Sequence, residues 1–180
     1  MNTFAVEKAS PDDLEGVLEL FDSVQAWLVT RGSKEKWGDE PFSKNETQRQ
    51  RFAVWLADGD FFFARNEGRI IGALVFSPEP PAYARAYFSG ACTGRVPGGY
   101  LEAFAIHRDY AAQGVGKVLL SWAEGEAQRR GLEILRLDCW AENVVLRAYY
   151  RHAGFLEVAP LTLGGWRGVL FEKLLKARAL

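Results

Sequence analysis

The sequence predicts one soluble domain of the α/β (α+β) class, with a central sheet flanked by helices. Segments with helical spacing alternate with strand-like segments from Phe4 to Leu174. The chain has 180 residues, 48% of them hydrophobic and 25% charged, which is ordinary for a globular protein with a sizeable core. Because no repeat or linker interrupts this pattern, residues 1–180 are expected to form a single domain.

The first half of the chain contains clear start and stop signals. Ser10 followed by Pro11 marks a helix start, and Asp58-Gly59 is a typical helix end. Asn66-Glu67-Gly68 separates two apolar runs, as in a β-hairpin. Residues 77–99 are rich in proline and glycine and are mostly loop. The expected elements are a strand at 4–8, helices at 11–29 and 43–57, strands at 61–65 and 69–76, and a short helix at 83–88.

The second half continues the alternation of helices and strands. Apolar residues recur every three or four positions from Val115 to Ala123, which predicts a helix with one buried face. Gly131 and Gly154 follow two predicted helices, where glycine is favoured. The expected elements are strands at 100–107 and 132–140, helices at 115–130 and 144–153, a strand at 156–158, a turn at 163–165 and a strand at 166–174.

The junction Gln113-Gly114-Val115-Gly116-Lys117, between a strand and a helix, has the character of a phosphate-binding turn. The first amides of a helix lack intrahelical partners and carry partial positive charge. Two glycines let a ligand approach, and no capping side chain precedes Gly114. A dinucleotide fingerprint would need glycine at Leu119, and a Walker loop would need glycine at Ala111 and Ser or Thr at Val118. Neither nucleotide motif is present.

The order of these parts resembles the GCN5-related N-acetyltransferase (GNAT) superfamily, which transfers an acyl group from coenzyme A to an amine. The similarity covers nearly the whole chain and is strongest over residues 100–155. Phe104 to His107 resembles the end of the family's fourth strand, and Tyr110 to Gly116 resembles its pyrophosphate loop. Asn143 and Tyr149-Tyr150 resemble the second half of its cofactor site. The resemblance implies a mixed sheet of six to seven strands, splayed between the fourth and fifth strands.

This resemblance implies acetyl-CoA as the acyl donor, with its pantetheine arm lying between the splayed strands. An amide near Ile106 would polarise the thioester carbonyl and stabilise the charge that develops on its oxygen. The implied cofactor contacts are backbone groups of Phe104, Ala105 and Ile106 for pantetheine, the loop Ala111, Ala112, Gln113, Gly114, Val115, Gly116 and Lys117 for the pyrophosphate, and Asn143 and Tyr150.

The loop departs from the family at its start. The family usually has Arg or Gln followed by Gly where this chain has Ala111 and Ala112. Losing the first side chain could weaken coenzyme A binding, or Arg108 or Lys117 could supply the missing charge. The same departure motivates an alternative function, a non-catalytic module of this fold that binds or senses acyl-CoA.

Two residues are expected to carry the proton transfers. An alkylammonium titrates near pH 10, so direct attack needs a base or a water path. Glu102, four residues before Ile106, is the candidate base, with a structural glutamate as the competing interpretation and His107 as a weaker rival. Tyr150 aligns with the family's acid for the departing thiolate, although it could be a core residue and Tyr149 could take its place. Asn143 is expected to cap the following helix as well.

The acceptor amine, from a small molecule or a peptide, is expected near the two N-terminal helices and the loops around Trp37 and residues 77–99. Trp37 and Glu102 are the candidate substrate-binding residues. Glu35, Asp39 and Glu40 could attract a cationic amine, but acidic loop residues are usually only solvated. The sequence does not identify the acceptor.

Composition excludes several classes of function. A formal net charge of −1 argues against nucleic-acid binding. The absence of a long apolar run or a signal-peptide pattern predicts a cytoplasmic protein without a membrane segment. Cys92 and Cys139 are too few for a disulfide framework, and their spacing suggests no metal site. Relatives commonly form homodimers, so a homodimer is the partner expectation.

Overall fold

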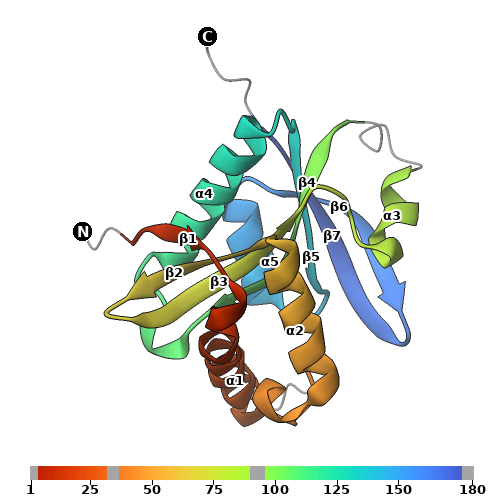
Figure 1. Cartoon of the computed structure of the whole chain (residues 1–180). Helices are drawn as coiled ribbons and strands as arrows, with labels where there is room; N and C mark the ends of the chain where they lie inside the picture. The colour runs from red at the N-terminus through yellow and green to blue at the C-terminus, as the bar shows by residue number, and fades with distance from the viewer. Residues whose placement is uncertain (1–3, 32–36, 90–95, 176–180) are drawn as a thin grey trace. The chain divides into compact units, whose positions relative to one another are not determined.

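The computed structural model describes residues 4–31, 37–89 and 96–175 (Figure 1). Helices and strands alternate along the chain, as the sequence predicts. The strands are β1 (Val6–Lys8), β2 (Phe61–Asn66), β3 (Arg69–Ser77), β4 (Gly98–Ile106), β5 (Ile134–Trp140), β6 (Leu156–Leu163) and β7 (Trp166–Leu174). The helices are α1 (Leu14–Thr30), α2 (Glu46–Asp58), α3 (Ala82–Ser89), α4 (Val115–Arg129) and α5 (Val144–His152), with short 3₁₀ turns at Pro11–Asp13, Phe42–Lys44 and Arg108–Tyr110.

The strands form a mixed sheet in the order β1-β2-β3-β4-β5-β7-β6, which confirms the predicted fold class. β4 and β5 are parallel, whereas β5 pairs with β7, and β7 with β6, in antiparallel fashion. The register of β4 and β5 runs from Gly98↔Ile134 to Leu101↔Leu137, although β4 itself continues to Ile106 and β5 to Trp140. The two strands therefore stop pairing half way along β4, as the predicted splay requires.

The chain divides into two compact units, each built from two stretches of sequence. Residues 1–75 and 103–122 form one, here called the N-terminal unit, and residues 76–102 and 123–180 form the other, the C-terminal unit. β4 and α4 each pass from one unit into the other. Ala103, the first residue of β4 in the N-terminal unit, has a left-handed backbone with φ +48°. Such a residue interrupts the regular alternation of a strand.

An aromatic cluster forms the core of the N-terminal unit, where α1 and α2 pack side by side (Figure 1). The Phe21 ring centroid lies 4.6 Å from that of Phe52 and 5.6 Å from that of Phe42. All three side chains are buried. These large rings bury the apolar stripe of each helix, which is the main source of helix stability in a protein.

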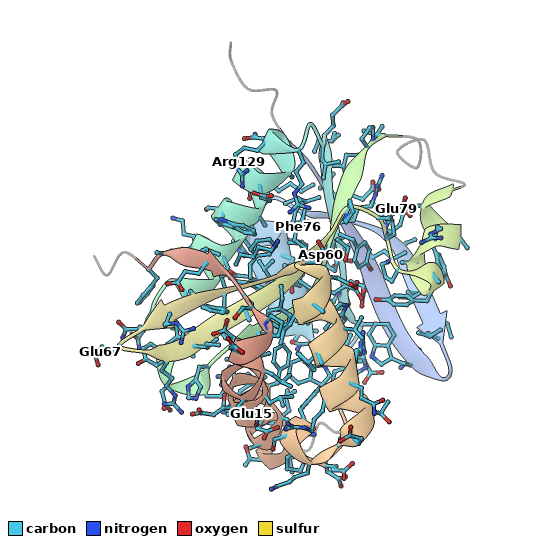
Figure 2. The ribbon with its side chains drawn as sticks, viewed as in Figure 1. Glu15, Asp60, Glu67, Phe76, Glu79 and Arg129 are labelled. Carbon is cyan, nitrogen blue, oxygen red and sulfur yellow. The ribbon has the colours of Figure 1, made fainter. Side chains whose placement is uncertain are left out.

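Local signals set the ends of these N-terminal elements. Glu67 and Gly68, both with positive φ, form the two-residue turn between β2 and β3, and Figure 2 shows Glu67 at its tip. The second helix begins at Glu46 instead of the predicted Ser43. The reason is Asn45, whose side chain accepts a hydrogen bond from the Gln48 amide at 3.0 Å and so acts as the cap.

The C-terminal unit contains β5, β7 and β6 with α3 and α5. A buried ion pair joins β5 to β7, with Arg136 Nε 2.9 Å from Glu172 Oε1. β6 extends to Leu163, beyond the predicted end at Val158, because it lies at the edge of the sheet, where Pro160 is tolerated. Among the residues that the structure describes, no helix is both long enough and apolar enough to cross a membrane.

Candidate active site

The predicted phosphate loop forms an open turn into α4. Ala112 has φ +61° and Gly114 has φ +86°, and α4 begins at Val115. The first intrahelical bond runs from the Val118 amide to the Gly114 carbonyl at 3.1 Å, so the amides of the preceding helical residues lie before the hydrogen-bond ladder. Gly114 is exposed, and a Cβ placed on it would meet no atom within 4 Å. The geometry leaves room for an anion at this helix end.

Ala112 explains how the loop retains this path without the family's usual glycine. Its backbone adopts the left-handed region that glycine normally occupies, at a cost of about 1–2 kcal/mol for an L-residue. The Gln113 side chain helps to hold the turn, since its Nε2 donates to the Asp109 carbonyl at 2.8 Å. Ala112 thus holds a backbone conformation that glycine adopts more readily.

A close contact that the sequence reasoning missed anchors α4. Gly72 of β3 is so close to α4 and β4 that a Cβ there would lie 2.8 Å from Val115 Cγ1, 2.9 Å from Ile106 Cδ1 and 3.0 Å from Leu119 Cδ1. Only glycine allows this approach without a shift of the neighbours. Gly72 thus positions the N-terminus of α4 against the end of β4.

The end of β4 carries the backbone groups that are predicted to meet pantetheine. Ala105 is buried, and Phe104 and Ile106 are half-buried. The next residue, His107, is buried and caps the following 3₁₀ turn, because its Nδ1 accepts from the Asp109 amide at 3.2 Å. Burial, with the positive charge of Arg69, lowers the pKa of His107. The imidazole is therefore neutral at physiological pH, and its contacts are those of a strand-end residue.

Trp37 belongs to the aromatic core of the N-terminal unit. Its ring centroid lies 5.5 Å from those of Phe21 and Phe42, and its carbonyl accepts from Gln25 Nε2 at 3.0 Å. The side chain is half-buried, so part of its surface remains open. Of the acidic residues considered with it, Glu40 accepts from Asn45 Nδ2 at 2.6 Å, and Glu35 lies outside the described residues.

In the C-terminal unit, α5 positions Asn143 and Tyr150. Asn143 Oδ1 accepts from the Leu146 amide at 3.0 Å and caps the helix, which confirms the predicted cap. Tyr150 is buried, and its ring centroid lies 5.5 Å from that of Phe171 and 6.0 Å from that of Phe155. Burial raises the pKa of Tyr150 well above its usual value, and nearby Cys139 and Asp138 raise it further. Tyr150 therefore keeps its proton at neutral pH.

Glu102 lies on β4 immediately after the last residue that pairs with β5, and its side chain is half-buried. Its charge contributes to the raised pKa of Tyr83, after the larger effects of burial and of Asp138. The charge of the candidate base therefore acts on the Tyr83 hydroxyl. Cys139 is buried in β5, in keeping with a packing role, and Cys92 lies outside the described residues.

A second polar group, absent from the sequence prediction, lies in the same unit. Asp138 Oδ1 accepts hydrogen bonds from Tyr100 Oη at 2.6 Å and from Tyr83 Oη at 2.9 Å. Burial, together with the Asp138 charge, raises the pKa of both phenols. Tyr83 is on α3, Tyr100 on β4 and Asp138 on β5, so the carboxylate joins three elements of the C-terminal unit.

Replacing Asp138 with alanine is expected to lower the free energy of unfolding by about 1–3 kcal/mol, because the hydroxyls of buried Tyr100 and half-buried Tyr83 lose their shared acceptor. Urea denaturation measures the change. Asp138→Asn keeps a carbonyl oxygen and should lose less. Equal losses in both variants would show that the charge of Asp138, and not its acceptor capacity, matters.

Comparisons with known proteins agree with this arrangement. The sequence profile of the acetyltransferase (GNAT) family matches residues 23–155. The chain is 26% identical over 166 residues to the uncharacterized N-acetyltransferase YesJ of Bacillus subtilis (strain 168), which covers 92% of this chain and 87% of that protein.

Two solved structures share the fold. A GNAT-family acetyltransferase from Listeria monocytogenes 4b F2365 has a TM-score of 0.74 and 20% identity, over 96% of this chain and 95% of its own. The PaiA N-acetyltransferase from Thermoplasma acidophilum, in complex with coenzyme A, has a TM-score of 0.71 and 20% identity, over 96% and 99%. The chain therefore belongs to the acetyltransferase (GNAT) family and is an N-acetyltransferase.

Proposed function

We propose that this protein moves the acetyl group of acetyl-CoA to a primary amine of a small molecule or peptide, by direct attack in a ternary complex. The observation that carries the proposal is the open turn before α4, where Gly114 is exposed at φ +86° and the next amides precede the helical ladder. Such a helix end suits a pyrophosphate. We also propose that residues 1–180 act as one catalytic domain, as a cytoplasmic homodimer.

The reaction requires two proton movements. The neutral amine nitrogen forms a bond to the thioester carbon, the carbon–sulfur bond then breaks, and the sulfur leaves with its electron pair. One proton is lost from the nitrogen and one is gained by the sulfur, so the products are an amide and a free thiol. Because an alkylammonium titrates near pH 10 and a thiol near pH 8.5, both steps need help at neutral pH.

We assign the roles residue by residue. Amides from Gln113 to Lys117 would hold the pyrophosphate, with Ala111 and Ala112 shaping the turn, and backbone groups from Phe104 to Ile106 would hold pantetheine and the thioester oxygen. Asn143 would contact the cofactor, and Trp37 the acceptor. Glu102 would take the proton from the amine, and Tyr150, protonated because of its burial, would donate to the departing sulfur.

Replacing Glu102 with glutamine is expected to lower kcat/KM for the amine by about 100-fold, the usual contribution of a general base. The pH dependence should also change, since the acidic limb set by the base would disappear. Release of free thiol measures both quantities. Glu133→Gln, which alters an exposed carboxylate just before β5, is the control and should behave like the wild type. An unaltered rate in the Glu102 variant would favour a water path.

The proposal as a whole is tested by thiol release from acetyl-CoA over a panel of primary amines, with calorimetric titration of acetyl-CoA alongside. We expect binding of acetyl-CoA and turnover of at least one class of amine. Binding without turnover over a broad panel would favour a module that binds acyl-CoA. A folded protein that binds no acetyl-CoA would refute the proposal.

A further inference from the structure

Arg108 is an arginine with an unusual environment in the N-terminal unit. Its Cζ lies 3.7 Å from the centroid of the Trp27 ring on α1, and its side chain is half-buried. Its Nε is buried without a hydrogen-bond partner, and no carboxylate within the described residues forms an ion pair with it. Within the part of the chain that the structure describes, the guanidinium therefore has an aromatic neighbour but no carboxylate partner.

Other arginines show that stacking does not exclude a carboxylate partner. Arg65 lies 4.6 Å from the Phe63 centroid and also pairs with Asp13 at 2.8 Å. Arg69, in the same unit, pairs with Glu19 at 2.8 Å. Arg108 differs from both because the charged neighbour that acts on its pKa is another cation.

That neighbour is Arg31, at the C-terminal end of α1, whose Cζ lies 5.5 Å from the same Trp27 centroid. Burial, and after it the charge of Arg31, lowers the pKa of Arg108. Two positive charges beside one indole repel each other, and a half-buried guanidinium without an acceptor loses part of its hydration. An anion at this place would offset both costs.

The stacked geometry leaves the guanidinium able to bind such an anion. An arginine that stacks uses the face of its planar group, whereas its N–H donors point outward along the edge. That edge matches a carboxylate or a phosphate, which can accept two parallel hydrogen bonds. The aromatic ring of Trp27 would hold the N–H donors of the guanidinium in a fixed orientation.

The position of Arg108 indicates which molecule would carry the anion. Arg108 follows Ile106, the proposed thioester-binding residue, by two positions. The amides proposed to hold the pyrophosphate, from Gln113 to Lys117, lie five to nine residues beyond Arg108. The ring that it contacts belongs to α1, one of the helices expected near the acceptor amine. Lys117, exposed on the first turn of α4, is better placed for the cofactor phosphates.

We propose that Arg108, held by Trp27 and reinforced by Arg31, binds an anionic group on the acceptor, so that the substrate is a primary amine carrying a carboxylate or a phosphate. This inference rests on the proposed acetyl transfer. It makes Arg108 a determinant of substrate choice and assigns it no part in the chemistry.

The test uses pairs of amines that differ in one anionic group: an α-amino acid against its amide, and phosphoethanolamine against ethanolamine. With wild-type enzyme, we expect kcat/KM for the better anionic amine to exceed that of its neutral partner by about ten-fold or more, the usual effect of a hydrogen bond to a charged group. Arg108→Gln should abolish the preference, and Arg108→Lys should retain only part of it. The pair of amines whose preference is lost in Arg108→Gln shows whether the anionic group is a carboxylate or a phosphate.

Arg69→Gln is the matched control, because it removes the same charge from the same unit at a side chain that already has Glu19 and Asp109 as partners. This variant should keep the wild-type preference. The proposal is overturned if the wild type shows no preference, if Arg108→Gln keeps it, or if Arg108→Gln weakens acetyl-CoA binding instead, since the arginine would then serve the cofactor.

A second readout separates this inference from the proposed function. The melting temperature is measured on protein saturated with coenzyme A, so that the pyrophosphate loop is occupied, while each amine of the panel is added. A rise with an anionic amine that is lost in Arg108→Gln supports the anion subsite even if no amine is acetylated. No rise with any anionic amine, together with no turnover, overturns it.

Discussion

Replacing Tyr150 with phenylalanine is expected to lower kcat for acetyl transfer by about ten-fold or more, with little change in the affinity for acetyl-CoA. Burial, reinforced by Cys139 and Asp138, raises the pKa of this phenol, so its proton is present throughout the neutral range. A phenol of high pKa would not transfer its proton to a resting thioester. It would donate as negative charge builds on the departing sulfur, and phenylalanine cannot do this.

The measurement is thiol release at saturating amine and acetyl-CoA. Phenylalanine keeps the ring contacts with Phe155 and Phe171, so the variant should fold, which circular dichroism and the melting temperature would verify. Tyr149→Phe is the control, because Tyr149 lies on the same helix with its ring centroid 5.7 Å from that of Tyr150 but is 36% exposed. If Tyr149→Phe loses the activity and Tyr150→Phe retains it, Tyr149 is the acid and Tyr150 is a core residue.

The raised pKa also predicts the alkaline side of the pH profile. A tyrosine that acts as an acid loses activity when it deprotonates, and here the pKa is shifted above the usual value of about 10. We therefore expect no fall in kcat attributable to Tyr150 below about pH 10. A wild-type alkaline limb near pH 8, absent in Tyr150→Phe, would contradict the assignment of the raised pKa.

Replacing Gly116 with aspartate is expected to weaken acetyl-CoA binding by about 100-fold or more. Gly116 lies in the first turn of α4, where a carboxylate would take the place of the phosphate near the free amides and repel it. Two charges about 4 Å apart near a protein surface interact by roughly 4 kcal/mol. The helix dipole stabilises a negative charge in the first turn of a helix, so the variant should remain folded.

Calorimetric titration with acetyl-CoA measures the loss. Gly125→Asp is the matched control, since it introduces the same residue into the same helix at an exposed glycine where a Cβ would meet no atom within 4 Å. That variant should bind acetyl-CoA like the wild type. Equal binding by the Gly116 variant would exclude the helix N-terminus as the phosphate site.

Much of the fold could be predicted because its signals are local. The Glu67-Gly68 turn requires two residues with positive φ, and glycine with a polar neighbour is the usual solution. Asn143 caps α5, and Gly154, at φ +89°, follows its end. In each case the residue type and the backbone conformation are linked within a few positions, so the chain alone indicates the structure.

Other features depend on residues far apart in the chain. Asp138 accepts hydrogen bonds from Tyr100 and Tyr83, which are 38 and 55 residues away in the sequence. No local pattern around Asp138 predicts either partner. In the sequence, Gly72 is only a glycine that weakens a strand. The structure shows that Val115 and Ile106 lie so close to it that a larger residue would not fit without a shift. The contact between Trp27 and Arg108 joins α1 to the 3₁₀ turn after β4, and the two residues are too far apart in the sequence for any periodic pattern to predict it.

The sequence by itself determined the order of helices and strands, the glycine-containing turn before α4 and the family resemblance, because these depend on residue spacing and on conformational preferences of single residues. Only the tertiary structure decided which side chains meet: the burial that raises the pKa of Tyr150, the shared acceptor Asp138, and an arginine in the turn after β4 that has no carboxylate partner among the described residues. Burial and electrostatic environment arise when distant segments pack together, and they control the chemistry that each side chain can perform.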